Sequence, residues 1–167
     1  MPAQKPHRSE QTVCTPREFL DAVEKRFGEI GFDLAAEKGN QVTRRPHTAA
    51  FFGPGSSLAE NALDSVCIWP NRGLSWLNPP FANIRAWARR CYEETVSTHG
   101  SRGRILLLVP AAVGSVWFNS FVRPRAFVFE LSPRLTFVGH KSPYPKDLIL
   151  AYYGPEGFVG RAAWRWK

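Results

Sequence analysis

The chain has 167 residues, of which 44% are hydrophobic and 13% aromatic, enough to bury the core of one domain. Its formal net charge is +8. Residues 82–167 carry 13 Lys or Arg against 5 Asp or Glu, whereas 1–45 carry 8 against 7 and 46–81 carry 1 against 2. A basic half is typical of a surface that faces a polyanion, most often nucleic acid, although a solvated basic surface has the same composition.

Cysteine and histidine usage argues against a disulfide framework or a zinc site. Cys14, Cys67 and Cys91 are far apart and form no Cys-x-x-Cys pair, and the four histidines are scattered. No apolar run approaches the length of a transmembrane helix, and residues 1–8 lack the apolar core of a signal peptide. We therefore expect a soluble protein of a reducing cytoplasm, with no metal and no membrane partner.

The first helix is expected over about 16–27. Thr15 is a good N-cap, Pro16 suits the first helical position, and Glu18 completes a Thr-x-x-Glu capping box. Gly28 ends the apolar periodicity. Capping alone would explain the Thr-Pro pair as well as any functional role does.

A short apolar run over 30–36 contains Asp33, followed by Ala35 and Ala36. It predicts a strand that runs into a loop, and open α/β sheets bind ligands at the carboxyl ends of their strands. Small residues there let a ligand approach the backbone, and Asp33 could meet a cationic or hydroxyl-rich ligand. Equally, Asp33 could merely cap a turn, and the Gly-x-Gly-x-x-Gly spacing that would identify a dinucleotide site is absent.

The next segment, 39–62, is rich in Gly, Pro and Ser and is expected to be irregular. It holds no P-loop, because the Gly-Lys-Ser/Thr ending is missing. Apolar residues resume over 63–69, which predicts a short strand or a turn. Asp64 in this run is a second candidate carboxylate for a bound ligand, or else a surface residue.

The most informative stretch is 74–81, Leu-Ser-Trp-Leu-Asn-Pro-Pro-Phe. Asn78 offers a side-chain carbonyl, and Pro79 and Pro80 have no N–H, so this point holds acceptors without competing donors. Such a place suits a planar amine. Phe81 follows at once and can stack on a flat ring, so the stretch predicts an active site for a nucleobase.

Periodicity predicts the remaining elements: a helix over 83–97, a buried strand over 104–110, a short helix containing Trp117, Phe118 and Phe121, a hairpin of 126–131 and 135–138, and a last strand over 148–153. Strands that alternate with helices early and follow one another late predict an α/β fold. Its sheet should be mostly parallel and end in antiparallel strands.

Three segments are expected along the chain. Residues 1–13 are polar and read as a mobile arm, 14–160 form the folded domain, and 161–167 are a basic aromatic tail. The cations and indoles of the tail could contact bases or phosphate. The alternative, favoured by the usual burial of Trp, is that the tail packs on the domain.

Three of these motifs, taken in order, carry a family likeness. Thr15-Pro16, the run over 32–36 and the run over 76–81 resemble those of the phage-type DNA N6-adenine methyltransferases, the Dam-like enzymes. The resemblance extends from about residue 14 to 153 and implies a single-domain Rossmann-like fold with S-adenosylmethionine bound over the strand ends. The chain departs from the fuller methyltransferase signature at Ala35 and Ala36, where that signature has glycines.

Roles for particular residues follow from the resemblance. It implies cofactor contacts from Thr15, Pro16, Asp33, Ala35, Ala36 and Asp64, and a catalytic set of Asn78, Pro79, Pro80 and Phe81. Asn78 and the Pro79 carbonyl would accept the hydrogens of adenine N6, which localises electron density on the nitrogen, and Phe81 would stack on the flipped-out base. No metal is needed. Double-stranded DNA would be gripped by basic residues after position 81, with Arg85, Arg89, Arg90, Arg134 and Lys141 as candidates.

Two other readings stay open. The same pocket logic suits another planar amine, such as cytosine N4, a guanine amine in RNA or a protein glutamine. A catalytically inactive methyltransferase-like fold that only binds DNA is the second. The expected setting is the cytoplasm of a bacterial host, with a phage or prophage as the source, and the sequence indicates neither the target site nor the oligomeric state.

Overall fold

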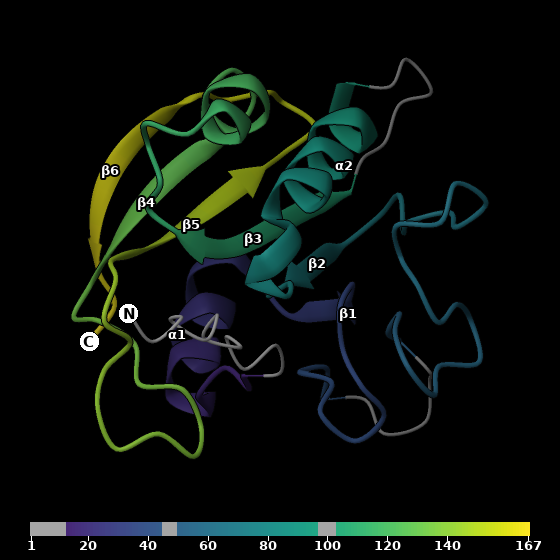
Figure 1. Cartoon of the computed structure of the whole chain (residues 1–167), viewed down its shortest axis with the longest axis horizontal. Helices are drawn as coiled ribbons and strands as arrows, with labels where there is room; N and C mark the ends of the chain where they lie inside the picture. Colours follow the sequence, from purple (N-terminus) through teal and green to yellow (C-terminus); the bar gives the residue numbers. More distant parts are fainter. Residues whose placement is uncertain (1–12, 45–49, 97–102) are drawn as a thin grey trace, which may run out of the picture.

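The computed structural model describes residues 13–44, 50–96 and 103–167. Six strands of this part form one mixed sheet in the order β1-β2-β3-β5-β4-β6 (Figure 1). Its elements are α1 (Arg17–Phe27), β1 (Ile30–Asp33), β2 (Leu74–Leu77), η1 (Phe81–Asn83), α2 (Ile84–Val96), β3 (Arg104–Pro110), η2 (Phe118–Val122), β4 (Phe127–Ser132), β5 (Leu148–Tyr153) and β6 (Gly160–Arg165). Residues 1–12 of the expected arm and residue 97 of the expected second helix lie outside the described residues.

The strand pairings confirm the expected mixture of directions. β1, β2 and β3 are parallel neighbours, β5 is antiparallel to both β3 and β4, and β6 is parallel to β4. β1, β2 and β3 therefore present their carboxyl ends at one edge of the sheet. This common edge is where a ligand site is expected in an open α/β sheet.

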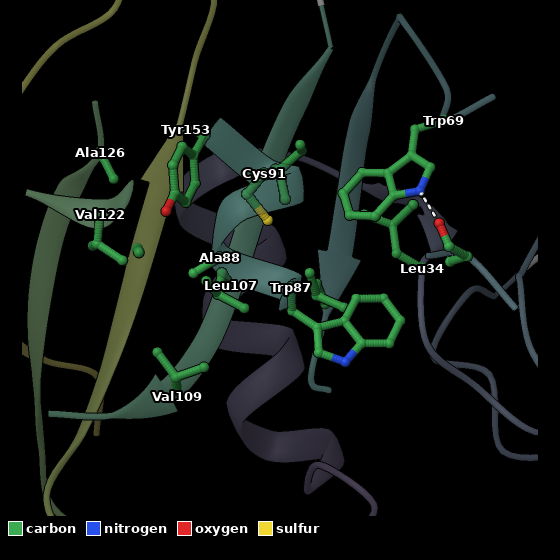
Figure 2. Close-up of a cluster of buried hydrophobic side chains, with 14 of the residues drawn as sticks. Leu34, Trp69, Trp87, Ala88, Cys91, Leu107, Val109, Val122, Ala126 and Tyr153 are labelled. Carbon is green, nitrogen blue, oxygen red and sulfur yellow. Dashed lines mark hydrogen bonds between the residues drawn. The ribbon is translucent and has the colours of Figure 1, made fainter. Parts of the chain in front are cut away.

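The sheet is covered on both faces, and the alternation of side chains along β3 shows how. Leu106 and Leu108 are buried in the apolar cluster that contains Phe19 and Val23 of α1. Leu107 belongs to the opposite cluster, with Trp87 and Cys91 of α2 and with Phe118 of η2 (Figure 2). β3 therefore needs apolar side chains on both faces, as its unbroken Ile-Leu-Leu-Leu-Val run predicted.

The start of α1 differs from the expected capping box. Pro16 is the N-cap residue and no side chain caps the helix. The Pro16 carbonyl accepts hydrogen bonds from the N–H groups of Phe19 and Leu20 instead. Thr15 is therefore not the cap, and its hydroxyl is committed elsewhere. The predicted end at Gly28 is confirmed, with φ at +99°.

The predicted hairpin is wrong, because β4 already has a neighbour on each side. β5 and β6 flank it, so 135–138 has no edge of β4 to pair with. Leu135 and Phe137 are instead buried in the cluster on the α1 face. The run over 63–69 forms turns rather than a strand.

A final strand after β5 was not predicted. β6 pairs along β4, and Trp164 is only 8% exposed. The alternative in which the terminal segment packs on the domain is therefore confirmed for its indole at 164, and β5 is not the last strand.

Candidate active site

A cavity of about 320 Å³ opens at the carboxyl ends of β1 and β2. Segments that are far apart in the sequence supply its walls. They are Val13, Cys14 and Thr15 before α1, seven residues over 33–42 from the end of β1 onward, six residues over 52–62, and Trp76, Asn78, Pro80 and Trp87 from β2, the segment after it and α2. The volume lies within the range usual for small-molecule sites.

The wall after β1 is built around Asp33. One carboxylate oxygen accepts the N–H of Ala35 at 3.2 Å and the other accepts the N–H of Val42 at 3.0 Å. Asp33 is 3% exposed, and this burial raises the pKa of its carboxyl from 3.8 to about 6, although both backbone hydrogen bonds act to lower it. The Asp33 side chain thus binds two N–H groups of the loop that follows β1, which agrees with the alternative in which Asp33 caps a turn.

Segment 50–53 closes the free edge of β1. The Asp33 N–H donates to Ala50, the Phe52 N–H donates to Asp33, and the Ala36 N–H donates to Phe52, each at 2.9 Å. Gly53 allows this close approach because a Cβ at its position would lie 1.8 Å from the Ala36 oxygen. Both Ala35 and Ala36 line the cavity, but the backbone that approaches Ala36 is the protein's own.

The third wall, over 59–69, is fixed to α2. The Trp69 indole donates to the Ala62 carbonyl at 2.8 Å, and its ring lies 6.5 Å from that of Trp87 (Figure 2). Arg90 donates to the Cys67 carbonyl at 2.6 Å, and its guanidinium lies 5.3 Å from the centre of the Trp69 ring. These contacts hold the segment that supplies Glu60, Asn61 and Ala62 to the cavity lining.

Asn78 follows β2 directly and lines the cavity. Its amide nitrogen donates to the Val13 carbonyl at 2.9 Å and to the Thr15 hydroxyl at 3.2 Å. Its amide oxygen is buried and has no hydrogen-bond partner among the described residues. A buried acceptor without a donor costs free energy, so this oxygen is suited to a ligand that brings an N–H.

The ionisable side chains that line the cavity are all acidic. Its lining has three carboxylates, from Asp33, Glu37 and Glu60, and two amides in addition to Asn78, from Asn40 and Asn61. Among the described lining residues there is no Lys, Arg or His. The site therefore favours a ligand with positive charge and hydrogen-bond donors.

The structure brings together part of the predicted site. Thr15, Asp33, Ala35, Ala36, Asn78 and Pro80 all line the cavity, whereas Pro16, Asp64, Pro79 and Phe81 are not among its lining residues. Asp64 is exposed and accepts a hydrogen bond from the Asn61 side chain at 2.8 Å. Phe81 packs its ring edge-on to Tyr144 at 5.8 Å.

Sequence reasoning missed Glu37, Asn40, Glu60, Asn61 and Trp87 as lining residues. Glu60 and Asn61 lie just before Asp64, in a segment without periodicity, so the only available signal was polarity within the loop. Trp87 reads as a core residue on the apolar face of α2, and it is one.

The five candidate DNA contacts have different surroundings. Arg85 and Lys141 are exposed. Arg89 pairs with Glu93 at 2.6 Å, and Arg134 pairs with Asp147 at 2.8 Å. Arg90 points at the loop over 64–69 and is half-buried, so its contacts are structural.

The parallel strand ends, the acidic cavity and the unpartnered amide oxygen define an α/β protein with a candidate ligand site at the edge of its sheet. The chain belongs to the DNA N-6-adenine-methyltransferase (Dam) family, whose model matches residues 3–147. It is 25% identical over 142 residues to a protein of Escherichia phage T1 named DNA N-6-adenine-methyltransferase. That alignment covers 85% of this chain and 53% of the phage protein, so the chain spans about half the length of this relative. No solved structure gives a significant match.

Two features of the described residues bear on the other expectations. In residues 13–44, 50–96 and 103–167, no three His, Cys, Asp or Glu side chains are grouped so as to hold a metal ion. Within the same ranges, no helix is long and apolar enough to cross a membrane.

Proposed function

We propose that this chain is an S-adenosylmethionine-dependent methyltransferase with a Rossmann-like sheet, and that it methylates the N6 amine of a flipped-out adenine in DNA. The observation that carries the proposal is the buried oxygen of Asn78, which has no partner among the described residues and belongs to a side chain that lines an acidic cavity. Membership of the Dam family supports the same reaction.

The residues of the cavity fit the methyl donor. S-adenosylmethionine supplies a methyl carbon on a positively charged sulfur, and attack by an amine nitrogen forms the N–C bond, breaks the C–S bond and leaves a neutral thioether. Asp33, Glu37 and Glu60 would favour its positive charge, and the amides of Asn40 and Asn61 could bind its polar groups. The rings of Trp87 and Phe52 offer apolar area for its base.

Asn78 would act on the adenine. The N6 lone pair is delocalised into the ring, and an acceptor for one amine hydrogen favours its localisation on nitrogen. The Asn78 oxygen is that acceptor in the proposal, and the Pro79 carbonyl would take the second hydrogen. The proton lost from N6 would leave along one of these hydrogen bonds to water. Placement of amine and donor in line supplies much of the remaining rate enhancement.

Phe81 and the exposed cations would hold the DNA. Phe81 is half-buried and braced by Tyr144, so its ring has a fixed orientation from which it could stack on an extrahelical base. Arg85 follows four residues later, near the start of α2, and Lys141 lies in the loop that carries Tyr144. We propose these two as phosphate contacts. Arg90 is excluded from this role by its contacts with Cys67 and Trp69.

The test is methyl transfer from labelled S-adenosylmethionine to four acceptors: DNA with adenine, DNA without adenine, RNA and protein. Transfer to adenine-containing DNA alone is expected, with N6-methyladenine in the digested product. Asn78→Ala should abolish transfer and leave the fold and binding of S-adenosylmethionine largely unchanged. Asn119→Ala is a matched control, because Asn119 is an exposed amide outside the cavity.

Other outcomes identify the alternatives. Transfer to RNA, to protein or to DNA lacking adenine would assign the site to another planar amine. A folded protein that shows no heat of binding with S-adenosylmethionine would be the inactive DNA-binding module. An Asn78→Ala variant with the rate of the unchanged protein would refute the assignment of the acceptor.

A further inference from the structure

We infer that Thr15 is a positioning residue. With the Val13 carbonyl it holds the Asn78 amide in the one orientation that leaves its oxygen without a partner among the described residues, and this pair of acceptors requires an amide rather than a carboxylate at position 78. The inference rests on the proposed function and deepens it. It gives Thr15 a role toward the acceptor side chain instead of the cofactor contact that the family resemblance implies.

The geometry fixes which end of the amide faces which way. A backbone carbonyl can only accept, so the group 2.9 Å from the Val13 oxygen must be the Asn78 nitrogen. The second N–H of the same nitrogen reaches the Thr15 hydroxyl at 3.2 Å. With both of its hydrogens used, the nitrogen stays in place, and the oxygen of the same planar group points away from Val13 and Thr15.

The reverse orientation would defeat the chemistry. A flipped amide would set its oxygen against the Val13 carbonyl, where two acceptors would meet without a hydrogen between them. It would also present N–H groups to the N6 amine, which is itself a donor. Thr15 alone does not forbid this state, because its hydroxyl can donate or accept, but it adds a second acceptor for the correct one.

The same acceptors discriminate against aspartate. A carboxylate at position 78 would have no N–H for the Val13 carbonyl and would place negative charge beside it. The Thr15 hydroxyl could still donate to it, so only the backbone contact would become repulsive. An Asn-to-Asp change is therefore expected to be damaging here, even though a carboxylate accepts hydrogen bonds well.

Thr15 is held by contacts that do not depend on Asn78. The Cys14 carbonyl accepts the N–H of Val138 at 3.0 Å, and the Pro16 carbonyl accepts two N–H groups of α1. Thr15 itself is 7% exposed. Removal of the hydroxyl alone should therefore leave segment 13–16 in place, which makes the role of the hydroxyl separable from that of the fold.

The experiment compares Thr15→Val, which keeps the shape and removes the hydroxyl, with Thr15→Ser, which keeps the hydroxyl. Loss of one hydrogen bond to the amide is expected to lower kcat about tenfold in Thr15→Val, with affinity for S-adenosylmethionine changed less than about twofold. Thr15→Ser should keep most of the kcat of the unchanged protein. Asn78→Asp should lower kcat at least about a hundredfold, because it loses the anchored amide altogether.

A readout that needs no activity is the hydrogen exchange of the Asn78 side-chain NH2, measured by NMR and assigned by its loss in Asn78→Ala. Exchange should be slow in the unchanged protein and faster in Thr15→Val. If this holds while the unchanged protein transfers no methyl group, the proposed function fails and the anchoring of the amide stands.

Three results would overturn the inference. Equal exchange rates and equal kcat in Thr15→Val would show that the hydroxyl does not anchor the amide. A kcat as low in Thr15→Ser as in Thr15→Val would show that the hydroxyl is not the group that anchors the Asn78 amide. A loss of cofactor affinity that accounts for the whole effect would return Thr15 to the cofactor site.

Discussion

Replacement of Arg90 by Met separates a structural arginine from a DNA contact. Met has a similar unbranched stem but no N–H groups, so the change removes the hydrogen bond to the Cys67 carbonyl, the pair with Glu94 at 2.7 Å and the contact with the Trp69 ring. Of the contacts described above between segment 59–69 and α2, the one between the Trp69 and Trp87 rings would remain.

The magnitude follows from these contacts. A hydrogen bond from a charged donor contributes about 1.5–3 kcal/mol, a partly buried cation–π contact about 1 kcal/mol, and an i,i+4 ion pair about 0.3–0.5 kcal/mol. Because neighbouring contributions do not add fully, we expect Arg90→Met to lower the free energy of unfolding by about 2–3 kcal/mol. Arg89→Met is the matched control. Arg89 is one residue away with a side chain 64% exposed, and it donates to the exposed carboxylate of Glu93, so a loss of at most about 0.5 kcal/mol is expected.

The assay is urea unfolding of both variants, followed by binding of S-adenosylmethionine and of DNA at several salt concentrations. Arg90→Met should weaken cofactor binding, because Glu60 and Asn61 lie on the loosened wall. The salt dependence of DNA binding should not change, because no phosphate contact is lost. The reasoning is refuted if Arg90→Met is as stable as Arg89→Met, or if it lowers the salt dependence.

Three further predictions concern the cavity and the DNA side. Because the folded pKa of Asp33, about 6, lies above its ordinary value of 3.8, its stabilising contribution is present below pH 3.8 and is lost as the pH rises through 6. The free energy of unfolding of the unchanged protein, relative to that of Asp33→Asn, should therefore fall by up to about 3 kcal/mol between pH 4 and 7. A difference that stays constant with pH in chemical denaturation would mean that Asp33 is not the titrating group. Gly53→Ala should destabilise the protein far more than Gly73→Ala, since both glycines have positive φ but only at Gly53 would the new Cβ meet backbone, at 1.8 Å from Ala36; equal urea midpoints would contradict this. Arg85→Gln should reduce the slope of log K for DNA against log salt by about 1, and an unchanged slope would remove Arg85 from the interface.

Local patterns in the sequence were sufficient where one segment decides its own structure. The apolar run of β3, the amphipathic periodicity of α2 and the glycine end of α1 each follow from residues within a few positions. The Asn-Pro-Pro-Phe stretch likewise predicted an acceptor at 78 from residue chemistry alone, and in the structure the oxygen of Asn78 is buried without a partner among the described residues.

Contacts between distant segments were outside the reach of such patterns. The hairpin prediction failed because β6, more than twenty residues further along, already occupies the other edge of β4. Asp64 was a reasonable candidate carboxylate, but the turn over 61–67 directs it outward and leaves Glu60 and Asn61 at the cavity. Arg90 has the sequence surroundings of one more surface cation, and only the packing of the loop over 64–69 against it makes it structural.

The sequence by itself was enough to predict the kind of chemistry, because an amide followed by two prolines is a property of neighbouring residues. The tertiary structure decided how the amide is oriented. Its nitrogen is held by Val13 and Thr15, which lie 65 and 63 positions away, so no local pattern could show that the oxygen is the end left for a ligand. The same folding brings three carboxylates from separate segments to one cavity and turns scattered acids into an acidic site.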